Sequence, residues 1–237
     1  MASEVFTYEK IPSGLLDLLS VHLPFSLPLL RRLQSAKSWG STDPSARLLF
    51  ASSAGKPPCD VDIVEGIHFA AAYLDPGAGP ETQMWIYSTL EDGGLSPEDA
   101  GTASQQVSHV VNHARNLGKE YKGELAFPGG ILIGSIHSSV SEALENAGIC
   151  FEWRSEFGYD KWLFRVEDLP PLPSNLPDGM HWSTATRDDC LLAISRNDLP
   201  RQVYDFPLVS LHVPRTDTYG IQGYPQSASK HDREALR

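Results

Sequence analysis

The stretch from residue 129 to residue 166 constrains the fold of this chain more than any other. It opens with Ile131–Ile136, a short apolar run that is rich in β-branched residues and follows two glycines. A run of this length and composition predicts a buried β-strand rather than a helix. Ser139 comes next, with Glu142 three residues later, which is the pattern of a helix capping box. The helix is expected to end at Gly148, because glycine readily adopts the left-handed conformation that follows many helices.

The residues after this helix return to strand chemistry. Ile149–Trp153 and Trp162–Val166 are rich in aromatic and aliphatic residues, and Gly158 suggests a turn between them. The order strand, helix, strand predicts a βαβ crossover, in which the helix covers one face of the sheet. The sequence therefore predicts a sheet centred on the strand at Ile131.

The preceding residues predict strands and helices that complete this sheet. The turn at 75–80 lies between two apolar runs, which favours an antiparallel hairpin. Ser96 and Pro97 suit the first positions of a long amphipathic helix, and Gly118 is expected to end it. Together these patterns predict a mixed α/β (α+β) fold, with a mainly antiparallel sheet flanked by helices, over residues 1–167. The predicted strands are 47–51, 67–74 and 83–90, and the predicted helices are 12–19, a second one starting at Ser26, and 95–117.

A second, smaller unit is expected after a linker. Residues 168–178 contain four prolines and cannot form a helix or a central strand, so they predict a semi-rigid spacer. Residues 179–213 then carry a strand pattern at Met180–Ala185, a helix from Thr186 to Ser195, and a strand pattern at Phe206–Val213. Residues 214–237 are polar and have no hydrophobic period, which predicts a disordered tail.

The composition narrows the class of partner and the compartment. The net charge of −11 and the pI near 5.1 argue against nucleic acid as a partner, because phosphates would be repelled by most of the surface. The three cysteines are far apart, which favours reduced thiols. The N-terminus has no basic region of a secretory signal, and Pro24 and Pro28 interrupt the most apolar segment. We therefore expect a soluble cytoplasmic protein that does not enter a membrane.

Two histidines on the predicted long helix are candidate metal ligands. His109 and His113 are four residues apart, a spacing that can bind zinc from one helix face. The metalloprotease pattern His-Glu-x-x-His requires a glutamate where Val110 stands, and no third ligand is evident. The sequence therefore predicts structural histidines and no metal.

Other candidate sites are weaker still. Ser135, His137 and Asp160 do not form the G-x-S-x-G elbow of a serine hydrolase, and Cys150 is expected to be a buried small apolar residue. The glycines near residue 130 match neither of the common nucleotide-binding loops. Trp85 and Tyr87 lie at alternating positions of a predicted strand, where an aromatic residue can line a ligand cleft. We take these two as candidate substrate-binding residues, and the sequence assigns no catalytic or cofactor-binding residue.

Five stretches of the sequence carry a resemblance to a known family. They are residues 22–34 (HLPFSLPLLRRLQ), 71–75 (AAYLD), 79–88 (GPETQMWIYS), 176–182 (LPDGMHW) and 196–201 (RNDLPR). Together they resemble the GNAT superfamily of N-acetyltransferases, in particular the two-lobed branch that is similar to glycine N-acyltransferases. The resemblance covers residues 20 to 205 approximately. It implies two tandem GNAT-like lobes and the transfer of an acyl group from acetyl-CoA, or another acyl-CoA, to a small-molecule amine.

The resemblance also implies where CoA binds. In the family the pantetheine and pyrophosphate lie in the second lobe, where a splayed strand and a loop of the form [RQ]-x-x-G-x-[GA] offer backbone N–H groups to the phosphates. No such loop follows the start of the second lobe here. The nearest string is Arg115–Glu120 in the first lobe, in which Glu120 replaces the small residue.

Three hypotheses follow from this comparison. The first is a working acyl-CoA-dependent N-acyltransferase, in which the chain, alone or as a dimer, still forms a CoA cleft. The second is a non-catalytic GNAT-like binding module, or the product of a truncated gene. The third, a metal hydrolase that uses His109 and His113, has the least support.

Overall fold

The computed structural model describes residues 4–39, 44–60, 67–78, 82–127, 129–153, 166–168, 180–184, 186–196 and 212–216. The chain divides into two compact units, Met1–Leu163 and Phe164–Arg237. The elements of the first unit are β1 (Phe6–Tyr8), α1 (Leu15–Val21), α2 (Leu27–Trp39), β2 (Arg47–Ser52), η1 (Pro58–Asp60), β3 (Phe69–Leu74), β4 (Met84–Ser88), η2 (Thr89–Asp92), α3 (Pro97–Glu120), β5 (Ile133–Gly134) and α4 (Ser138–Asn146). The elements of the second are η3 (Val166–Asp168), β6 (Met180–Thr184), α5 (Arg187–Ser195) and β7 (His212–Thr216).

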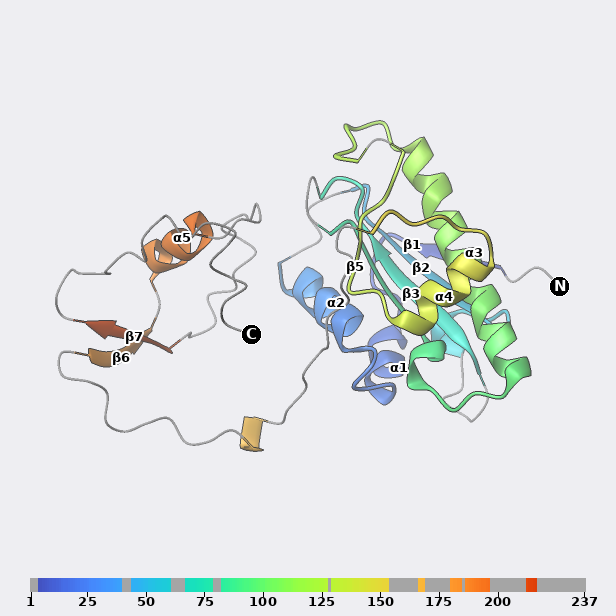
Figure 1. The fold of residues 1–237 in the computed structure, drawn as a ribbon, viewed down its shortest axis with the longest axis horizontal. Helices are drawn as coiled ribbons and strands as arrows, with labels where there is room; N and C mark the ends of the chain where they lie inside the picture. The colour runs from blue at the N-terminus through green and yellow to red at the C-terminus, as the bar shows by residue number, and fades with distance from the viewer. Residues whose placement is uncertain are drawn as a thin grey trace, which may run out of the picture. The chain divides into compact units, whose positions relative to one another are not determined.

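The first unit is built on a five-stranded sheet in the order β1-β2-β3-β4-β5. Strands β1 to β4 pair antiparallel, and β4 pairs with β5 in parallel. Helices α1 and α2 cover one face of this sheet, and α3 and α4 cover the other (Figure 1). The predicted α+β fold, with a mixed and mainly antiparallel sheet between helices, is therefore confirmed.

Side-chain alternation along the strands explains the two helical layers. Successive residues of a strand point to opposite faces, so a strand covered on both sides is apolar throughout. Strand β3 is buried along its whole length; Ala71 and Tyr73 join the core under α1 and α2, whereas Ala70 and Ala72 join the core under α3 and α4. The predicted hairpin between β3 and β4 is confirmed by the pairing of Leu74 with Met84.

Helix α3 begins as predicted and ends later than predicted. The Ser96 side chain accepts a hydrogen bond from the backbone N–H of Asp99, and Pro97 is the first helical residue. Gly118 does not end the helix, which runs on to Glu120. An added Cβ at Gly118 would lie 3.3 Å from Cδ1 of Ile131, so the small residue allows close packing against the segment that leads to β5.

The strand that was expected to be the centre of the sheet is its short edge. Only Ile133–Gly134 form β5, and both residues are half-buried rather than buried. The prediction of a buried strand over Ile131–Ile136 was wrong because apolar composition does not distinguish a central strand from an edge packed under a helix. The parallel pair is β4 and β5, so the crossover encloses α3 and not α4.

Three further local predictions around α4 need correction. The N-cap is His137, whose Nδ1 accepts from the backbone N–H of Ser139, so the predicted capping box of Ser139 and Glu142 does not form. No strand follows this helix among the described residues up to 153. Cys150 is exposed rather than buried, whereas Gly148 has the expected positive φ of 76°. The strand predicted at 162–166 lies almost wholly outside the described residues, with only Val166 described, at the start of η3.

The second unit contains a two-stranded antiparallel sheet of β6 and β7 together with α5. Helix α5 opens as predicted, since the carboxylate of Asp189 accepts from the backbone N–H of Thr186 at 2.7 Å and Thr186 Oγ1 accepts from the N–H of Asp189 at 3.3 Å. Strand β7 is His212–Thr216, so it extends into the segment that was predicted to be a disordered tail. The proline-rich spacer from residue 169 and the tail beyond 216 lie outside the described residues.

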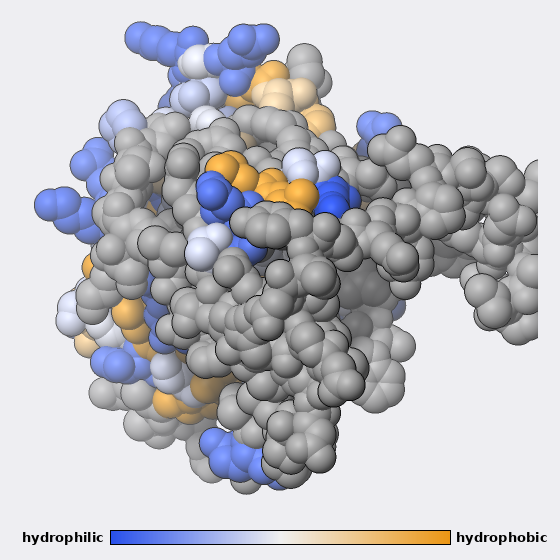
Figure 2. Space-filling view, turned by 90° about the vertical axis from the view of Figure 1, so that its left-hand side faces the viewer, coloured by the Kyte–Doolittle hydropathy of each residue, from blue (hydrophilic) through white to orange (hydrophobic). Residues whose placement is uncertain are grey.

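No helix among the described residues is both long enough and apolar enough to cross a membrane. On the face drawn in Figure 2, the visible hydrophobic side chains form small separate groups that are bordered by hydrophilic ones.

Candidate functional site

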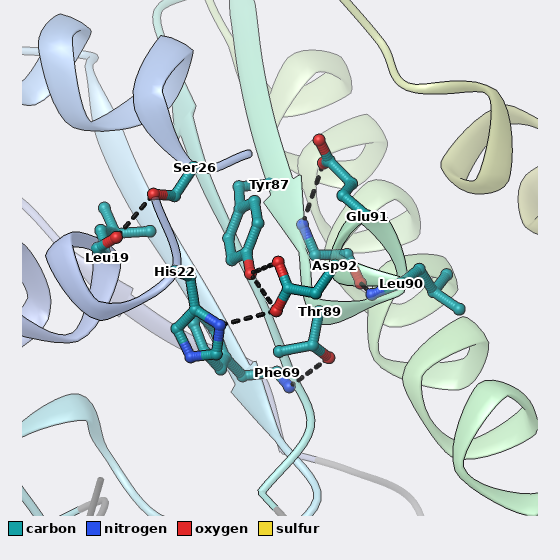
Figure 3. Close-up of polar contacts among 10 residues, drawn as sticks. Leu19, His22, Ser26, Phe69, Tyr87, Thr89, Leu90, Glu91 and Asp92 are labelled. Carbon is teal, nitrogen blue, oxygen red and sulfur yellow. Dashed lines mark hydrogen bonds and ion pairs between the residues drawn. The ribbon is translucent and has the colours of Figure 1, made fainter. Parts of the chain in front are cut away.

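A charged and aromatic cluster joins the α1–α2 connection to the turn after β4. Nδ1 of His22 lies 2.7 Å from Oδ2 of Asp92. The hydroxyl of Tyr87 donates to the same carboxylate, at 2.7 Å from Oδ1 and 2.9 Å from Oδ2. Figure 3 shows the His22 and Tyr87 side chains converging on Asp92 from two different elements. The carboxylate is therefore fixed by two donors, and in turn it fixes the imidazole ring.

The local sequence explains why Asp92 stands where it does. Ser88, the last residue of β4, caps the short helix η2: its Oγ accepts from the N–H of Leu90, and its own N–H donates to Oε1 of Glu91 at 3.2 Å. The Thr89 hydroxyl oxygen accepts from the N–H of Phe69 on the neighbouring strand. These bonds, drawn in Figure 3, hold the turn against the sheet and present the Asp92 carboxylate toward α1.

The His22 ring is held by packing as well as by its hydrogen bond. It lies 5.1 Å, edge to face, from the ring of Phe69 and 5.8 Å from the ring of Tyr87, measured between centroids. The side chains of His22 and Asp92 are 22% and 27% exposed. An imidazole whose Nδ1 is hydrogen-bonded to a carboxylate carries its hydrogen on Nδ1, which leaves Nε2 as a proton acceptor.

Tyr87 was a predicted substrate-binding residue, and the structure places it underneath this cluster. Its side chain is buried in the core below α1 and α2. Burial is the main cause that raises the pKa of its phenol above the ordinary value of 10.0, and the hydrogen bond to Asp92 adds to it. Tyr87 is therefore a neutral hydrogen-bond donor at neutral pH.

Trp85, the other predicted substrate-binding residue, lies two positions earlier on the same face of β4. It is half-buried against the core under α1 and α2. Its indole Nε1 is buried and has no hydrogen-bond partner among the described residues. Trp85 is paired with Gly134, the last residue of β5, so it marks the point at which the two parallel strands stop pairing.

Beyond that point β4 and β5 separate. Strand β4 continues to Ser88 with no pairing partner on this side among the described residues, whereas β5 turns away at Ser135, which has a positive φ of 55°. Phe25 of the α1–α2 connection packs edge to face on His137 at the start of α4, with 6.3 Å between ring centroids. The segment 22–25 therefore touches the turn after β4 through His22 and the helix after β5 through Phe25.

The turn between β4 and α3 does not offer a site for phosphate groups. Four carboxylates lie in and after it, on Glu91, Asp92, Glu98 and Asp99. The backbone N–H groups of Leu90 and Asp99 are already bound by serine side chains. An anion would meet both the repulsion of these acids and occupied donors. The Arg115–Glu120 string ends α3 rather than opening it, so it offers no such site either.

Of the two histidines of the metal hypothesis, His113 has a structural contact, whereas the buried Nδ1 of His109 has no hydrogen-bond partner among the described residues. Nε2 of His113 lies 2.9 Å from the Thr7 hydroxyl, which links α3 to β1. Among the described residues no group of three or more His, Cys, Asp and Glu side chains is arranged to hold a metal ion. Asp160 of the rejected serine triad is outside the described residues.

A cavity of about 520 Å³ lies at the other end of the sheet, between the segment that joins β1 to α1 and the start of β2. Its walls include Leu33, Leu48 and Tyr73, and its rim carries the ion pair of Arg47 and Glu9 at 3.7 Å. Neither His22 nor Asp92 lines it, so its volume does not belong to the cluster described above.

His22 and Asp92 were not predicted from the sequence. Their partnership spans 70 positions, and neither belongs to a known short motif. One feature of the sequence could have identified His22 as a candidate: it is the one titratable side chain between Asp17 and Arg31, in a run that is otherwise apolar or uncharged.

Comparison with known proteins identifies the family of the first unit. A family model described as the acyl-CoA N-acyltransferase verG N-terminal domain matches residues 2–162. A search of curated proteins and a search of solved structures gave no match. The matched residues make up more than half of the 237-residue chain and include every element from β1 to α4. The expected resemblance to GNAT-type acyltransferases is thus confirmed, and the chain belongs to the family of acyl-CoA N-acyltransferase verG N-terminal domains.

Proposed function

We propose that this protein catalyses N-acyl transfer from an acyl-CoA thioester to an amine, with His22 as the proton acceptor. The observation that carries the proposal is the pairing of His22 with Asp92 at the place where β4 and β5 separate. The family supplies the general reaction, acyl transfer from CoA to nitrogen. The choice of His22 rests on its geometry.

The chemistry of the transfer requires a base of this kind. An amine attacks a thioester carbonyl only in its neutral form, and the nitrogen must lose a proton as the C–N bond forms. Nε2 of His22 accepts that proton while the C–S bond breaks and CoA leaves as a thiolate. The proton is then returned to the thiolate, so the products are an amide and free CoA. Asp92 stabilises the imidazolium formed in between, because its carboxylate stays within hydrogen-bonding distance of Nδ1.

The rest of the cluster keeps the base in place. Tyr87 has no open route to substrate, since its side chain is buried and its hydroxyl is bound to Asp92. We therefore assign it the role of orienting Asp92. Trp85, which is only half-buried, is the better candidate for a direct substrate contact.

The phosphates of CoA need donors outside the turn before α3, because that turn is acidic and its N–H groups are occupied. The proposal therefore assigns the reacting amine and thioester, and not the nucleotide end of CoA, to the region around His22. The donor, whether acetyl-CoA or a larger acyl-CoA, is a co-substrate, and no step of the proposed reaction requires a metal.

Release of free thiol from an acyl-CoA in the presence and absence of amines tests the proposal. We expect amine-dependent release by the full chain, and at least a 100-fold loss in His22→Gln, within the range typical for removal of a general base. His113→Gln is the matched control, because that histidine is also hydrogen-bonded but through Thr7 on β1. Calorimetric titration with acyl-CoA supplies the second readout. No heat at millimolar thioester, together with no thiol release, would instead favour a non-catalytic binding module.

A further inference from the structure

The residues on either side of His22 form an exposed apolar surface. Val21, Leu23 and Phe25 are 57%, 47% and 40% exposed. Only two other large hydrophobic side chains are exposed to this extent in the part of the chain that the structure describes, Trp153 and Leu192. Three of the five therefore lie within five consecutive residues. Single exposed apolar residues are ordinary, but a concentration of them marks a contact surface.

This surface is held in a fixed shape. The N–H of His22 donates to the carbonyl of Leu19 at 3.1 Å, and the N–H of Ser26 donates to the carbonyl of His22 at 3.1 Å. The Ser26 side chain is buried and its hydroxyl donates to the same carbonyl of Leu19, as Figure 3 shows. Because the backbone on both sides of His22 is hydrogen-bonded, the exposed side chains are pre-arranged and do not have to be ordered when a ligand binds.

The surface is uncharged as well as apolar. No Asp, Glu, Lys or Arg lies between Asp17 and Arg31, although one residue in five of the whole chain carries a charge. The ammonium group of an acceptor or the phosphates of CoA gain nothing from such a surface, whereas a hydrocarbon chain is removed from water by it.

We infer that this apolar surface, Val21, Leu23 and Phe25, binds the hydrocarbon part of the acyl group, so that the preferred donor carries a longer or aromatic acyl chain rather than acetyl. The inference rests on the proposed function, because the reacting carbonyl must lie near Nε2 of His22. Val21 and Leu23 flank His22 in sequence, and Phe25 packs on His137 at the start of α4, so the surface borders the proposed site. A single methyl group is too small to cover three exposed side chains, so the surface is matched only by a chain of several carbons.

A series of CoA thioesters from acetyl to octanoyl, with one amine at fixed concentration, tests the inference. We expect kcat/KM to rise by roughly twofold for each added methylene. On a logarithmic scale, this is about half of the effect expected when a methylene group is removed completely from water. Leu23→Ser and Phe25→Ser should flatten this dependence on chain length. Trp153→Ser, at a similarly exposed residue elsewhere in the first unit, should retain the full chain-length dependence.

Binding of the same thioesters without amine gives a readout that does not depend on turnover. If octanoyl-CoA binds at least tenfold more tightly than acetyl-CoA, and Leu23→Ser removes that difference, the inference holds even in a chain that does not turn over. Equal affinities and a flat rate series would overturn it while leaving the proposed function intact. A rate that depends on the length of the amine's substituent, and not on the acyl chain, would assign the surface to the acceptor and also overturn it.

Discussion

The imidazole of His22 and the carboxylate of Asp92 are 70 positions apart in sequence and 2.7 Å apart in space. The bond joins the α1–α2 connection, which carries an exposed apolar surface, to the capped turn that follows β4. It also brings the one histidine of an uncharged segment beside the edge where the parallel strands separate. The proposed proton transfer depends on this arrangement.

Asp92→Asn should reduce the rate of amine acylation while the protein stays folded. An amide at this position can donate to Nδ1, which favours the tautomer whose hydrogen is on Nε2, and it no longer stabilises the imidazolium. We expect kcat to fall by about 100-fold or more, with little change in KM. Glu98→Gln is the control, since this nearby carboxylate has no side-chain partner among the described residues. A rise in KM with unchanged kcat would show instead that Asp92 contributes to substrate binding only.

Tyr87→Phe should destabilise the fold. The change removes a buried donor from a carboxylate that accepts it through both oxygens, and bonds to a charged acceptor contribute about 1.5–3 kcal/mol. Urea unfolding should therefore show a loss of about 2 kcal/mol with an unchanged m-value. Tyr8→Phe serves as the control, because the hydroxyl of that half-buried tyrosine has no hydrogen-bond partner among the described residues. Equal losses in the two variants would contradict the role given to the Asp92 contact.

The start of α3 should lose stability in acid. The Ser96 hydroxyl, which donates to Asp99 at 2.7 Å, is the first cause that lowers the pKa of the Asp99 carboxyl below its ordinary value of 3.8, and His68 at 3.1 Å is the second. A carboxyl with a lowered pKa in the folded state contributes stability at a pH above its unfolded value, and the contribution is lost as the pH falls through the folded value.

Asp99→Asn should therefore destabilise the protein at neutral pH and flatten the fall in stability below a pH of about 4. Chemical denaturation at several pH values measures both effects. Asp17→Asn, at an exposed aspartate with no hydrogen-bond or ion-pair partner among the described residues, should leave the acid limb as steep as in the wild type. If Asp99→Asn also leaves the fall in stability below a pH of about 4 as steep as in the wild type, the stabilising role given to the Asp99 carboxylate is wrong.

Gly101→Ala should stabilise the protein. Gly101 lies in the interior of α3, it is exposed, and an added Cβ would meet no atom within 4 Å. Alanine has a higher helix propensity than glycine, which predicts a gain of about 0.5–1 kcal/mol. Gly134→Ala is the opposite case, since its Cβ would meet the side chain of Thr82 at 2.5 Å. Thermal unfolding should move the two variants in opposite directions.

Local signals predicted the parts of the fold that local chemistry determines. Ser96 and Pro97 fixed the start of α3, and the turn between Leu74 and Met84 fixed the hairpin. Gly118 was misread because its small size serves packing against Ile131 rather than a left-handed turn. Whether β5 is a central or an edge strand depends on which strands pair with each other. The apolar run at Ile131 does not specify its pairing partners.

The candidate site was harder to predict than the fold. Tyr87 was selected for its aromatic ring and its place on a strand, but its role comes from a hydroxyl that meets Asp92 in the next turn. The His22 side chain bonds a residue 70 positions away, and its neighbours in sequence are apolar. A contact between segments that are far apart has no local pattern, so only the folded arrangement brings the proton acceptor and its carboxylate together.

Chemical rescue of His22→Ala by imidazole tests the central claim most directly. The substitution removes the side chain that bonds Asp92 and leaves space in which a free imidazole can bind to the same carboxylate. We predict that His22→Ala loses amine-dependent thiol release and that added imidazole restores part of it, whereas His22→Ala/Asp92→Asn is not restored. Wild-type rates in His22→Ala, or a loss that imidazole does not restore in either variant, would contradict the assignment of His22 as the proton acceptor.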